Sequence, residues 1–254
     1  MSPHTAVASA TQQKDSRTPS FDLIAKHYRW LEYLTFGGAL WRCRTHFLPQ
    51  IAGCRNALIL GDGDGRFTAA LLHANPTLQI DAVDCSLAML GLLRQRARAA
   101  SPDAPARLRT HHTDAGAFVH ELASGRIYDL VVTHFFLDCF AQHEVELLAR
   151  DLTAHLQPGA LWLVSDFRIP PGVVRWPARA LVRSLYLAFR ILTGLRTARL
   201  PDHDAALGRA GFARIAQRLS LGGILTTELW VMRASGAEAA YTPHHAVAAT
   251  TSPG

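Results

Sequence analysis

Three glycines alternate with two aspartates directly after an apolar run that is typical of a buried strand. The segment comprises Gly61, Asp62, Gly63, Asp64 and Gly65. Glycine at a strand-to-helix turn lets the backbone approach a ligand where a Cβ would collide. The two carboxylates would repel a pyrophosphate, which binds to bare amide N–H groups. They would attract an ammonium or a sulfonium group, so the segment predicts a site for a cationic cofactor such as S-adenosylmethionine.

The glycine spacing argues against a dinucleotide cofactor. The dinucleotide fingerprint G-x-G-x-x-G requires a third glycine for close packing of helix on strand. Arg66 occupies that position here. A turn that binds no ligand is the alternative explanation for the glycines alone.

A further acidic residue ends the next predicted strand. The run from Leu78 to Val83 is followed by Asp84, nineteen residues after Gly65. A carboxylate there suits a cis-diol, because each hydrogen bond to a charged group contributes about 1.5–3 kcal/mol. We therefore expect Asp84 to bind the cofactor's ribose. The alternative is that Asp84 or Ser86 caps the following helix.

Five segments, in this order, resemble the class I S-adenosylmethionine-dependent methyltransferases, and most closely the type found in ubiquinone and menaquinone biosynthesis. They are residues 57–65, 80–90, 113–115, 128–134 and 156–166. The resemblance covers roughly residues 21–233. It implies a Rossmann-like α/β fold and S-adenosylmethionine as cofactor.

The resemblance also implies roles for individual residues. The three glycines would surround the methionine moiety, with Asp84 on the ribose, Met89 near the adenine face and Asp114 on the adenine amino group. The matching segments place further residues at the cofactor: Asp62, Asp64, Cys85, Thr113, Ala115 and His134. One position departs from the family, which usually has an acid where this chain has Ile59. Asp62 or Asp64 is the expected substitute.

Methyl transfer from a sulfonium needs a base only when the acceptor must lose a proton. His134 is the best candidate, because the pKa of free histidine lies near neutral pH. Alternatively, His134 packs beside the cofactor and contributes only shape. Asp138 and Tyr28 are weaker catalytic candidates, and the aromatic segment around Tyr28 is predicted to cover the cofactor.

Composition bounds the remaining possibilities. The chain has 254 residues, 49% of them apolar, which is enough for one sizeable core. Residues 1–20 and 235–254 read as disordered tails flanking one domain at 21–234.

The four dispersed cysteines suit reduced thiols, and the paired histidines lack metal-site spacing, so we expect no metal. No secretory signal is apparent, which predicts a cytoplasmic protein, and the net charge of +6 comes without a nucleic-acid motif.

Apolar periodicity predicts a doubly wound, seven-stranded sheet with a terminal antiparallel hairpin and a helical lid. The expected strands are 57–60, 78–84, 107–112, 129–133, 161–165, 213–220 and 225–232. The expected helices are 21–47, 66–73, 87–100, 145–156 and 203–210. In such sheets ligands bind beyond the carboxyl ends of the strands, where the acids of this basic chain gather.

The expected lid, about residues 168–201, reads as a basic amphipathic helix. Four arginines share one side and four apolar residues another: Arg175, Arg179, Arg183, Arg190, and Leu181, Leu185, Phe189, Leu192. The hypothesis is a pocket for a small lipophilic acceptor with possible peripheral contact to anionic headgroups. The alternative is an ordinary lid helix. Two other functions stay open: another adenosine-cofactor enzyme, such as an aminopropyltransferase or a nicotinamide oxidoreductase, and a non-catalytic S-adenosylmethionine-binding protein.

Overall fold

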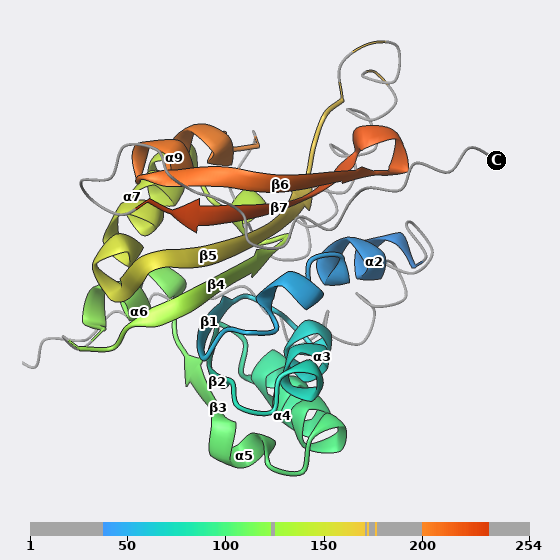
Figure 1. Cartoon of the computed structure of the whole chain (residues 1–254), viewed down its shortest axis with the longest axis vertical. Helices are drawn as coiled ribbons and strands as arrows, with labels where there is room; N and C mark the ends of the chain where they lie inside the picture. Colours follow the sequence, from blue (N-terminus) through green and yellow to red (C-terminus); the bar gives the residue numbers. More distant parts are fainter. Residues whose placement is uncertain (1–37, 123–124, 171, 173–175, 177–199, 234–254) are drawn as a thin grey trace, which may run out of the picture.

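A computed structural model describes residues 38–122, 125–170, 172, 176 and 200–233. Its centre is a seven-stranded sheet in the order β3-β2-β1-β4-β5-β7-β6 (Figure 1). Strand β7 runs antiparallel to both of its neighbours, and the other pairs are parallel. The strands are β1 Asn56–Leu60, β2 Gln79–Asp84, β3 Leu108–His112, β4 Tyr128–His134, β5 Leu156–Phe167, β6 Phe212–Ser220 and β7 Leu225–Met232. The predicted Rossmann-like α/β fold with a terminal hairpin is confirmed.

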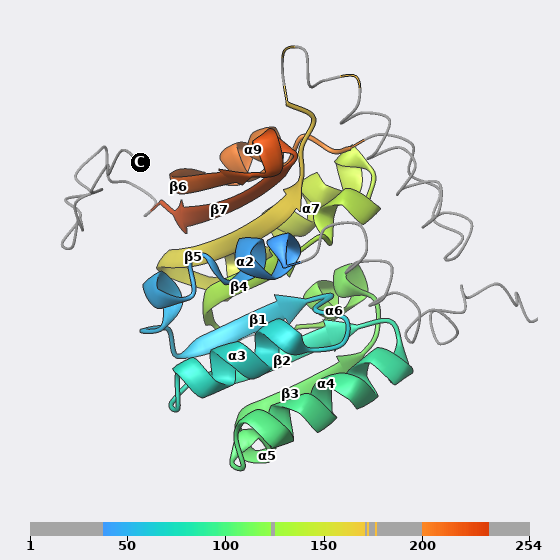
Figure 2. The ribbon, with the colours of Figure 1, turned by 90° about the vertical axis from the view of Figure 1, so that its right-hand side faces the viewer.

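Helices cover both faces of the sheet (Figure 2). On one face lie α2, α3 and α4, and on the other lie α6, α7 and α9, while α5 sits near the β3 edge. The helices are α2 Ala39–Thr45, α3 Arg66–Ala74, α4 Leu87–Ala100, α5 Ala104–Arg107, α6 Ala115–Glu121, α7 Gln142–Leu152 and α9 His203–Arg209. Short 3-10 turns occupy Pro49–Ile51, Leu137–Cys139, Thr153–His155 and Leu221–Gly223.

The central strands are buried on both faces, which explains their nearly continuous apolar sequence. In β1, Leu58 and Leu60 face the core beneath α6, α7 and α9, while Ala57 and Ile59 face the core beneath α3 and α4. All four are fully buried. Alternation therefore divides one strand between two cores, and this rigid centre fixes the position of the turn that follows Leu60.

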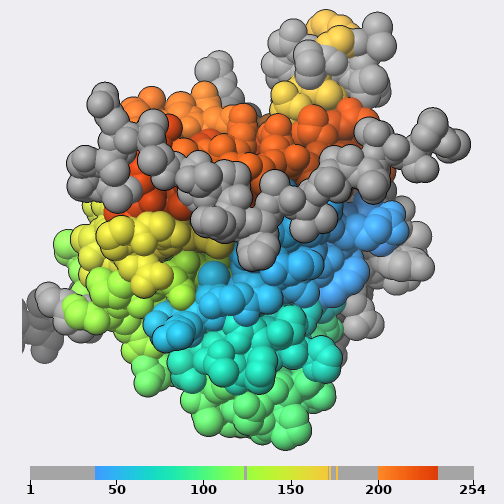
Figure 3. All heavy atoms as spheres, in the orientation of Figure 1, coloured from blue at the N-terminus to red at the C-terminus, as the bar shows by residue number. Residues whose placement is uncertain are grey.

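The terminal hairpin completes the sheet beside β5. The 3-10 turn that links β6 to β7 contains Gly222 and Gly223, at φ angles of 62° and 88°. Glycine is suited to this left-handed backbone. Helix α2 lies against the hairpin on the face shown in Figure 3, between it and α3.

Several boundaries differ from the sequence-based expectations. Strand β5 begins five residues early, because a shift in its pairing with β4 next to Gly159 accommodates the Gln-Pro-Gly stretch. Of the expected helix 21–47, the described part is α2, followed by a 3-10 turn. Helices α5 and α6 were not expected. The two tails and most of the expected lid lie outside the described residues.

The strand order reverses between β1 and β4, since β2 and β3 lie on one side and β5 on the other. Helices that leave neighbouring strands on opposite faces of the sheet open a crevice at such a point, beyond the carboxyl ends. Gly61 follows β1 and Phe135 follows β4, so the segments that matter for chemistry border this crevice. No helix among the described residues is both long and apolar enough to cross a membrane.

Candidate active site

All three glycines of the turn after β1 adopt left-handed backbone, with φ of 67°, 60° and 77° at Gly61, Gly63 and Gly65. Their surroundings differ. A Cβ on Gly61 would lie 2.3 Å from the Phe136 ring, and one on Gly65 would lie 2.5 Å from the Leu93 backbone. A Cβ on Gly63 would meet no atom within 4 Å. Gly61 and Gly65 therefore permit close protein packing, and Gly63 is the glycine with open space beside it.

The two aspartates of the turn are mostly engaged with the protein. Asp62 is buried, and its Oδ2 accepts hydrogen bonds from the Thr68 backbone N–H at 2.8 Å and from the Thr68 hydroxyl at 2.7 Å. Asp64 pairs with Arg66 and Arg96, with N–O distances of 3.2 and 2.9 Å. The charge of Asp64 is therefore balanced by two arginines, and Asp62 is the better substitute for the missing family acid.

Asp62 retains one oxygen for further chemistry. Among the described residues, its buried Oδ1 has no hydrogen-bond partner. Burial raises the pKa of Asp62, while the positive charge of Arg44 on α2 and the bonds from Thr68 oppose that rise. A buried carboxyl oxygen without a partner is costly, so it suits a ligand that donates a hydrogen bond or carries positive charge.

Asp84 lies at the tip of β2 and is bound to the glycine turn. Its Oδ1 accepts a hydrogen bond from the Ser86 backbone N–H at 2.8 Å, and the Gly63 backbone also donates to the carboxylate. Ser86, rather than Asp84, caps α4 by accepting from the Met89 N–H. Burial raises the pKa of Asp84 to about 6. The Asp84 carboxylate thus connects the loop after β1 to the loop after β2 through hydrogen bonds.

The remaining residues that are predicted to lie near the adenine follow β2 and β3. Asp114 is exposed and caps α6, accepting from the Gly116 and Ala117 N–H groups through Oδ1 alone. Its neighbours in the loop are Thr113, half-buried, and Ala115, buried at the start of α6. After β2, Cys85 in the loop is exposed, and Met89 in the first turn of α4 is half-buried. These positions border the carboxyl ends of β2 and β3, as the resemblance implies.

His134 ends β4 and is 3% exposed. Its ring packs edge-on against Phe67 of α3, with centroids 4.4 Å apart. Burial, and secondarily the charge of Arg44, lowers the pKa of His134 well below its ordinary value. Neither ring nitrogen has a hydrogen-bond partner among the described residues. The imidazole is therefore neutral at pH 7.

Two buried carboxyl groups meet beyond β4 and β5. Asp138 and Asp166 are 5% and 2% exposed, and their side chains are hydrogen-bonded to each other. Burial, followed by the negative charge of Asp138, raises the pKa of Asp166 well above its ordinary value. Two carboxyl groups this close together disfavour the ionisation of both at once. Tyr28, the third predicted catalytic residue, lies outside the described residues.

Two features of this site escaped the sequence analysis. Arg44 is 6% exposed on α2, and its guanidinium lies 5.3 Å from the ring centroid of Phe135. Phe136 packs directly on Gly61. Arg44 is next to Cys43 within the apolar stripe of α2. A basic residue in an apolar stripe was the sequence signal that could have predicted a buried arginine at this site.

Comparisons with known proteins bear on this site. A family model described as a methyltransferase domain matches residues 58–162, which include the glycine turn, Asp84, Asp114 and His134. Residues 58–162 therefore carry a methyltransferase domain. Together with the Rossmann-like fold, this match supports a class I S-adenosylmethionine-dependent methyltransferase. S-adenosylmethionine is its cofactor.

Solved structures agree on the fold of this methyltransferase domain. An O-methyltransferase family protein from Burkholderia thailandensis is 19% identical, with a TM-score of 0.59, over 87% of this chain and 64% of its own. A putative O-methyltransferase from Nostoc punctiforme is also 19% identical, with a TM-score of 0.61 and the same coverage. The N-methyltransferase NodS from Bradyrhizobium japonicum, in complex with S-adenosylhomocysteine, is 15% identical, with a TM-score of 0.55, over 76% of this chain and 87% of its own.

The methyltransferase chain thus spans less than two thirds of the length of the first two structures. A search of curated proteins returned no match. The family description names a domain without an acceptor. The resemblance to the ubiquinone and menaquinone type therefore stays a prediction.

Proposed function

We propose that this methyltransferase transfers the sulfonium methyl of S-adenosylmethionine to a small lipophilic acceptor by in-line displacement. The cofactor supplies the reactive carbon and the leaving group. The protein has to position the acceptor, and orientation can contribute about 7–11 kcal/mol to lowering the barrier. The observation that supports a lipophilic acceptor is the presence of two pairs of aromatic rings at the carboxyl ends of β4 and β5. They are Phe135 with Phe167, and Phe136 with Phe140.

The two ring pairs pack on different cores, the first on the cluster formed by α2 and Leu225 and the second on the core beneath α6, α7 and α9. Phe135 and Phe167 have centroids 5.0 Å apart, and Phe136 and Phe140 have centroids 4.8 Å apart. All four side chains are half-buried, so part of each remains open to a ligand. Phe135 has a φ of 53°, which a bulky residue rarely adopts. Backbone strain of this kind concentrates at functional sites, in agreement with a role of the Phe135–Phe167 pair in meeting a substrate.

For an acceptor that must lose a proton, we assign proton acceptance to Asp138 rather than to His134. A strongly lowered pKa makes the His134 imidazole a weak base. Asp138 is hydrogen-bonded to Asp166, and its negative charge contributes to raising the pKa of Asp166, so Asp138 is the member of the pair that we assign as proton acceptor. His134 then contributes shape beside the cofactor. Tyr28 stays a prediction for the cofactor cover.

A methyl-transfer assay with matched acceptors tests this function. We would supply labelled S-adenosylmethionine with pairs of phenols, amines and enolisable ketones, each pair differing only in an alkyl tail or a sulfonate. We expect turnover of tailed acceptors and a KM at least about 10-fold higher in Phe167→Ala, since burying such a ring contributes about 1.5–3 kcal/mol. Affinity for S-adenosylhomocysteine should not change. Equal turnover of the sulfonated partners would contradict the lipophilic assignment.

The proposal extends to location and membrane contact. The arginines expected to touch anionic headgroups lie outside the described residues, so this contact rests on the sequence pattern. The four free cysteines support a cytoplasmic location. A liposome-pelleting assay in which Arg175, Arg179 and Arg183 are replaced by glutamate checks the membrane contact, and equal pelleting of both proteins would reject it.

A further inference from the structure

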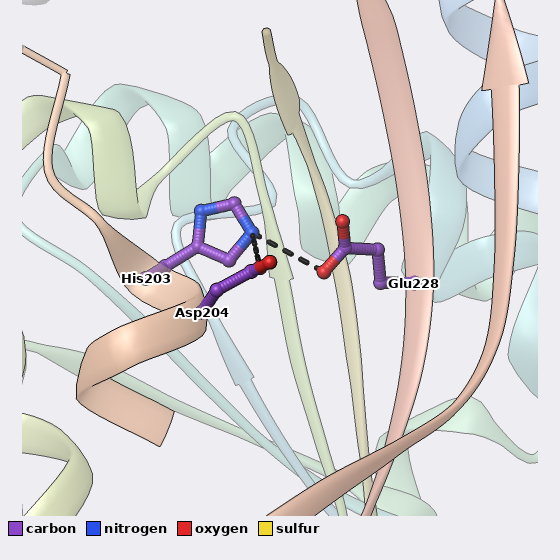
Figure 4. Close-up of side chains that lie close together, drawn as sticks. All are labelled: His203, Asp204 and Glu228. Carbon is purple, nitrogen blue, oxygen red and sulfur yellow. Dashed lines mark hydrogen bonds and ion pairs between the residues drawn. The ribbon is translucent and has the colours of Figure 1, made fainter. Parts of the chain in front are cut away.

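Three side chains from α9 and β7 converge on one point, away from the glycine turn (Figure 4). His203 and Asp204 come from the first turn of α9, and Glu228 comes from the middle of β7. The His203 Nε2 lies 3.4 Å from Asp204 Oδ1 and 3.3 Å from Glu228 Oε2. No two of these three atoms are more than 4.8 Å apart.

The separations fit the ligand spacing around a small divalent ion. Bonds of about 2.0–2.1 Å in a tetrahedral site place neighbouring ligand atoms roughly 3.3 Å apart. The His203 nitrogen already has this separation from both carboxylate oxygens. Only the two oxygens need to approach each other. The Asp204 side chain is 47% exposed and can rotate to do so, whereas Glu228 is fixed in the sheet.

The opposite oxygens of both carboxylates are held by other residues. Glu228 Oε1 accepts from the Gln217 amide at 2.8 Å and from the Thr226 hydroxyl at 2.9 Å. Asp204 Oδ2 accepts from Arg214 at 2.6 Å. Oδ1 of Asp204 and Oε2 of Glu228 face His203, and Oε2 also accepts a hydrogen bond from the Trp230 indole N–H at 3.0 Å. Hydrogen bonds to the non-ligating atoms of a ligand set orient it in metal sites in the same way.

A cavity of about 360 Å³ adjoins the cluster, and His203, Asp204 and Glu228 all line it. Asp166 and Phe167, at the carboxyl end of β5, line the same cavity. An ion therefore has an entry path. Three protein ligands leave a coordination position open for water or for an oxygen atom of a ligand in the cavity.

We propose that His203, Asp204 and Glu228 bind a divalent metal ion of the zinc type. One imidazole and two carboxylates suit Zn²⁺ and its neighbours in the first transition row, and they do not suit a soft ion. The spacing of cysteines and of paired histidines predicted no metal, and it could not reveal this site, because Glu228 is separated from His203 by 24 residues of sequence. The proposal does not depend on the acceptor or on the cofactor.

The competing explanation is an ion-pair network without metal. Arg214 contacts both Asp204 and Glu228, and a protonated His203 would add a second cation between them. Such a network would fasten α9 to the terminal hairpin. It predicts that replacing any member lowers stability, while added metal has no effect. Direct metal binding separates the two explanations.

The test is a titration of the full chain with Zn²⁺ alone, after treatment with a chelator, by calorimetry and by the absorption of Co²⁺ as a substitute. We expect the wild type to bind Zn²⁺ at one site. In Asp204→Ala and in Glu228→Gln the Zn²⁺ affinity of that site should fall at least about 10-fold. Asp204 is exposed, so its variant keeps the fold, and circular dichroism verifies this. His143→Ala, an exposed histidine beside Glu144, is the matched control and should bind as the wild type does.

Three results would overturn the metal site. They are a wild-type dissociation constant for Zn²⁺ above about 1 mM, unchanged Zn²⁺ binding in both ligand variants, and an equal loss of binding in His143→Ala. A lower melting temperature in the ligand variants, with Zn²⁺ binding intact, would identify the ion-pair network instead.

Discussion

Gly63 and Gly65 have the same left-handed backbone and different neighbours. An L-residue in this conformation costs about 1–2 kcal/mol. At Gly65 a Cβ would also collide with the backbone of Leu93. Such overpacking costs about 1–3 kcal/mol more. We expect Gly65→Ala to lower the free energy of unfolding by about 2–5 kcal/mol and Gly63→Ala by about 1–2 kcal/mol. Urea denaturation measures both, and equal losses would contradict this account of the turn.

Gly63→Ala has a second expected consequence. Gly63 is the glycine with open space beside it, and its backbone donates to Asp84. A methyl group here enters the volume assigned to the methionine moiety. We expect S-adenosylhomocysteine to bind at least about 10-fold more weakly to Gly63→Ala, an effect out of proportion to its small loss of stability. Calorimetry on the folded variant measures this affinity.

Asp84 predicts a pH dependence of cofactor binding. The pKa of its carboxyl group is about 6 in the fold against an ordinary 3.8, so the fold without cofactor is stabilised below pH 3.8 and loses that contribution as the pH rises through 6. Ribose hydroxyls favour the ionised form. Affinity for S-adenosylhomocysteine should therefore weaken as the pH falls from 7 to 5, with a midpoint near 6.

Calorimetry at several pH values checks this dependence. In Asp84→Ala the affinity should drop by about 1.5–3 kcal/mol at pH 7 and the pH dependence should vanish. His112 lies close enough to lower the pKa of the Asp84 carboxyl, so His112→Gln is the control and should keep the pH dependence, with a midpoint that does not fall. An Asp84→Ala protein that binds the cofactor normally would remove Asp84 from the ribose site.

At the residue scale, the sequence predicted which positions meet at the crevice better than what they do there. Spacing placed the glycines, Asp84 and Asp114 after consecutive strands, and parallel strands bring their carboxyl ends together. It could not foresee that Arg66 and Arg96 neutralise Asp64, because Arg96 comes from the next helix. It also could not foresee that His134 is buried against Phe67, because that contact depends on how α3 packs.

Among the elements, the long periodic ones were predictable and the short ones were not. Strand β1 and helices α3 and α4 carry an apolar pattern that local sequence determines. Helix α5 has four residues and contains Pro105, so it offers no period to detect. Strand β5 was placed too late because Pro158 and Gly159 are typical turn residues, yet here they lie inside the strand.

Strand β6 depends on one buried aromatic residue. Phe212 is 2% exposed and packs edge-on against Trp162 of β5, with centroids 5.3 Å apart. Phe212→Ala leaves a cavity beneath the hairpin, and such a truncation costs about 3–5 kcal/mol. Chemical denaturation should show this loss. Ile215→Ala, on the same strand but 38% exposed, is the control and should cost less than about 1 kcal/mol.

The whole molecule should be stabilised by its cofactor. A ligand that binds only the folded state at 100 times its dissociation constant adds about 2.7 kcal/mol. For a domain of this size that corresponds to a rise in melting temperature of roughly 5–10 °C. We expect S-adenosylhomocysteine to produce this rise and NADH to produce none. A shift with NADH would favour the nicotinamide oxidoreductase over the methyltransferase.

The position of β7 governs how the sheet is completed during synthesis. Although β7 is the last strand of the sheet in sequence, it is inserted between β5 and β6. A nascent chain that has released β1 to β5 therefore presents the unpaired edge of β5, which carries Leu161 and Leu163, until β7 leaves the ribosome. Open apolar edges invite association with other chains. The vulnerable species in cells is thus the chain that has released β5 but not yet β7.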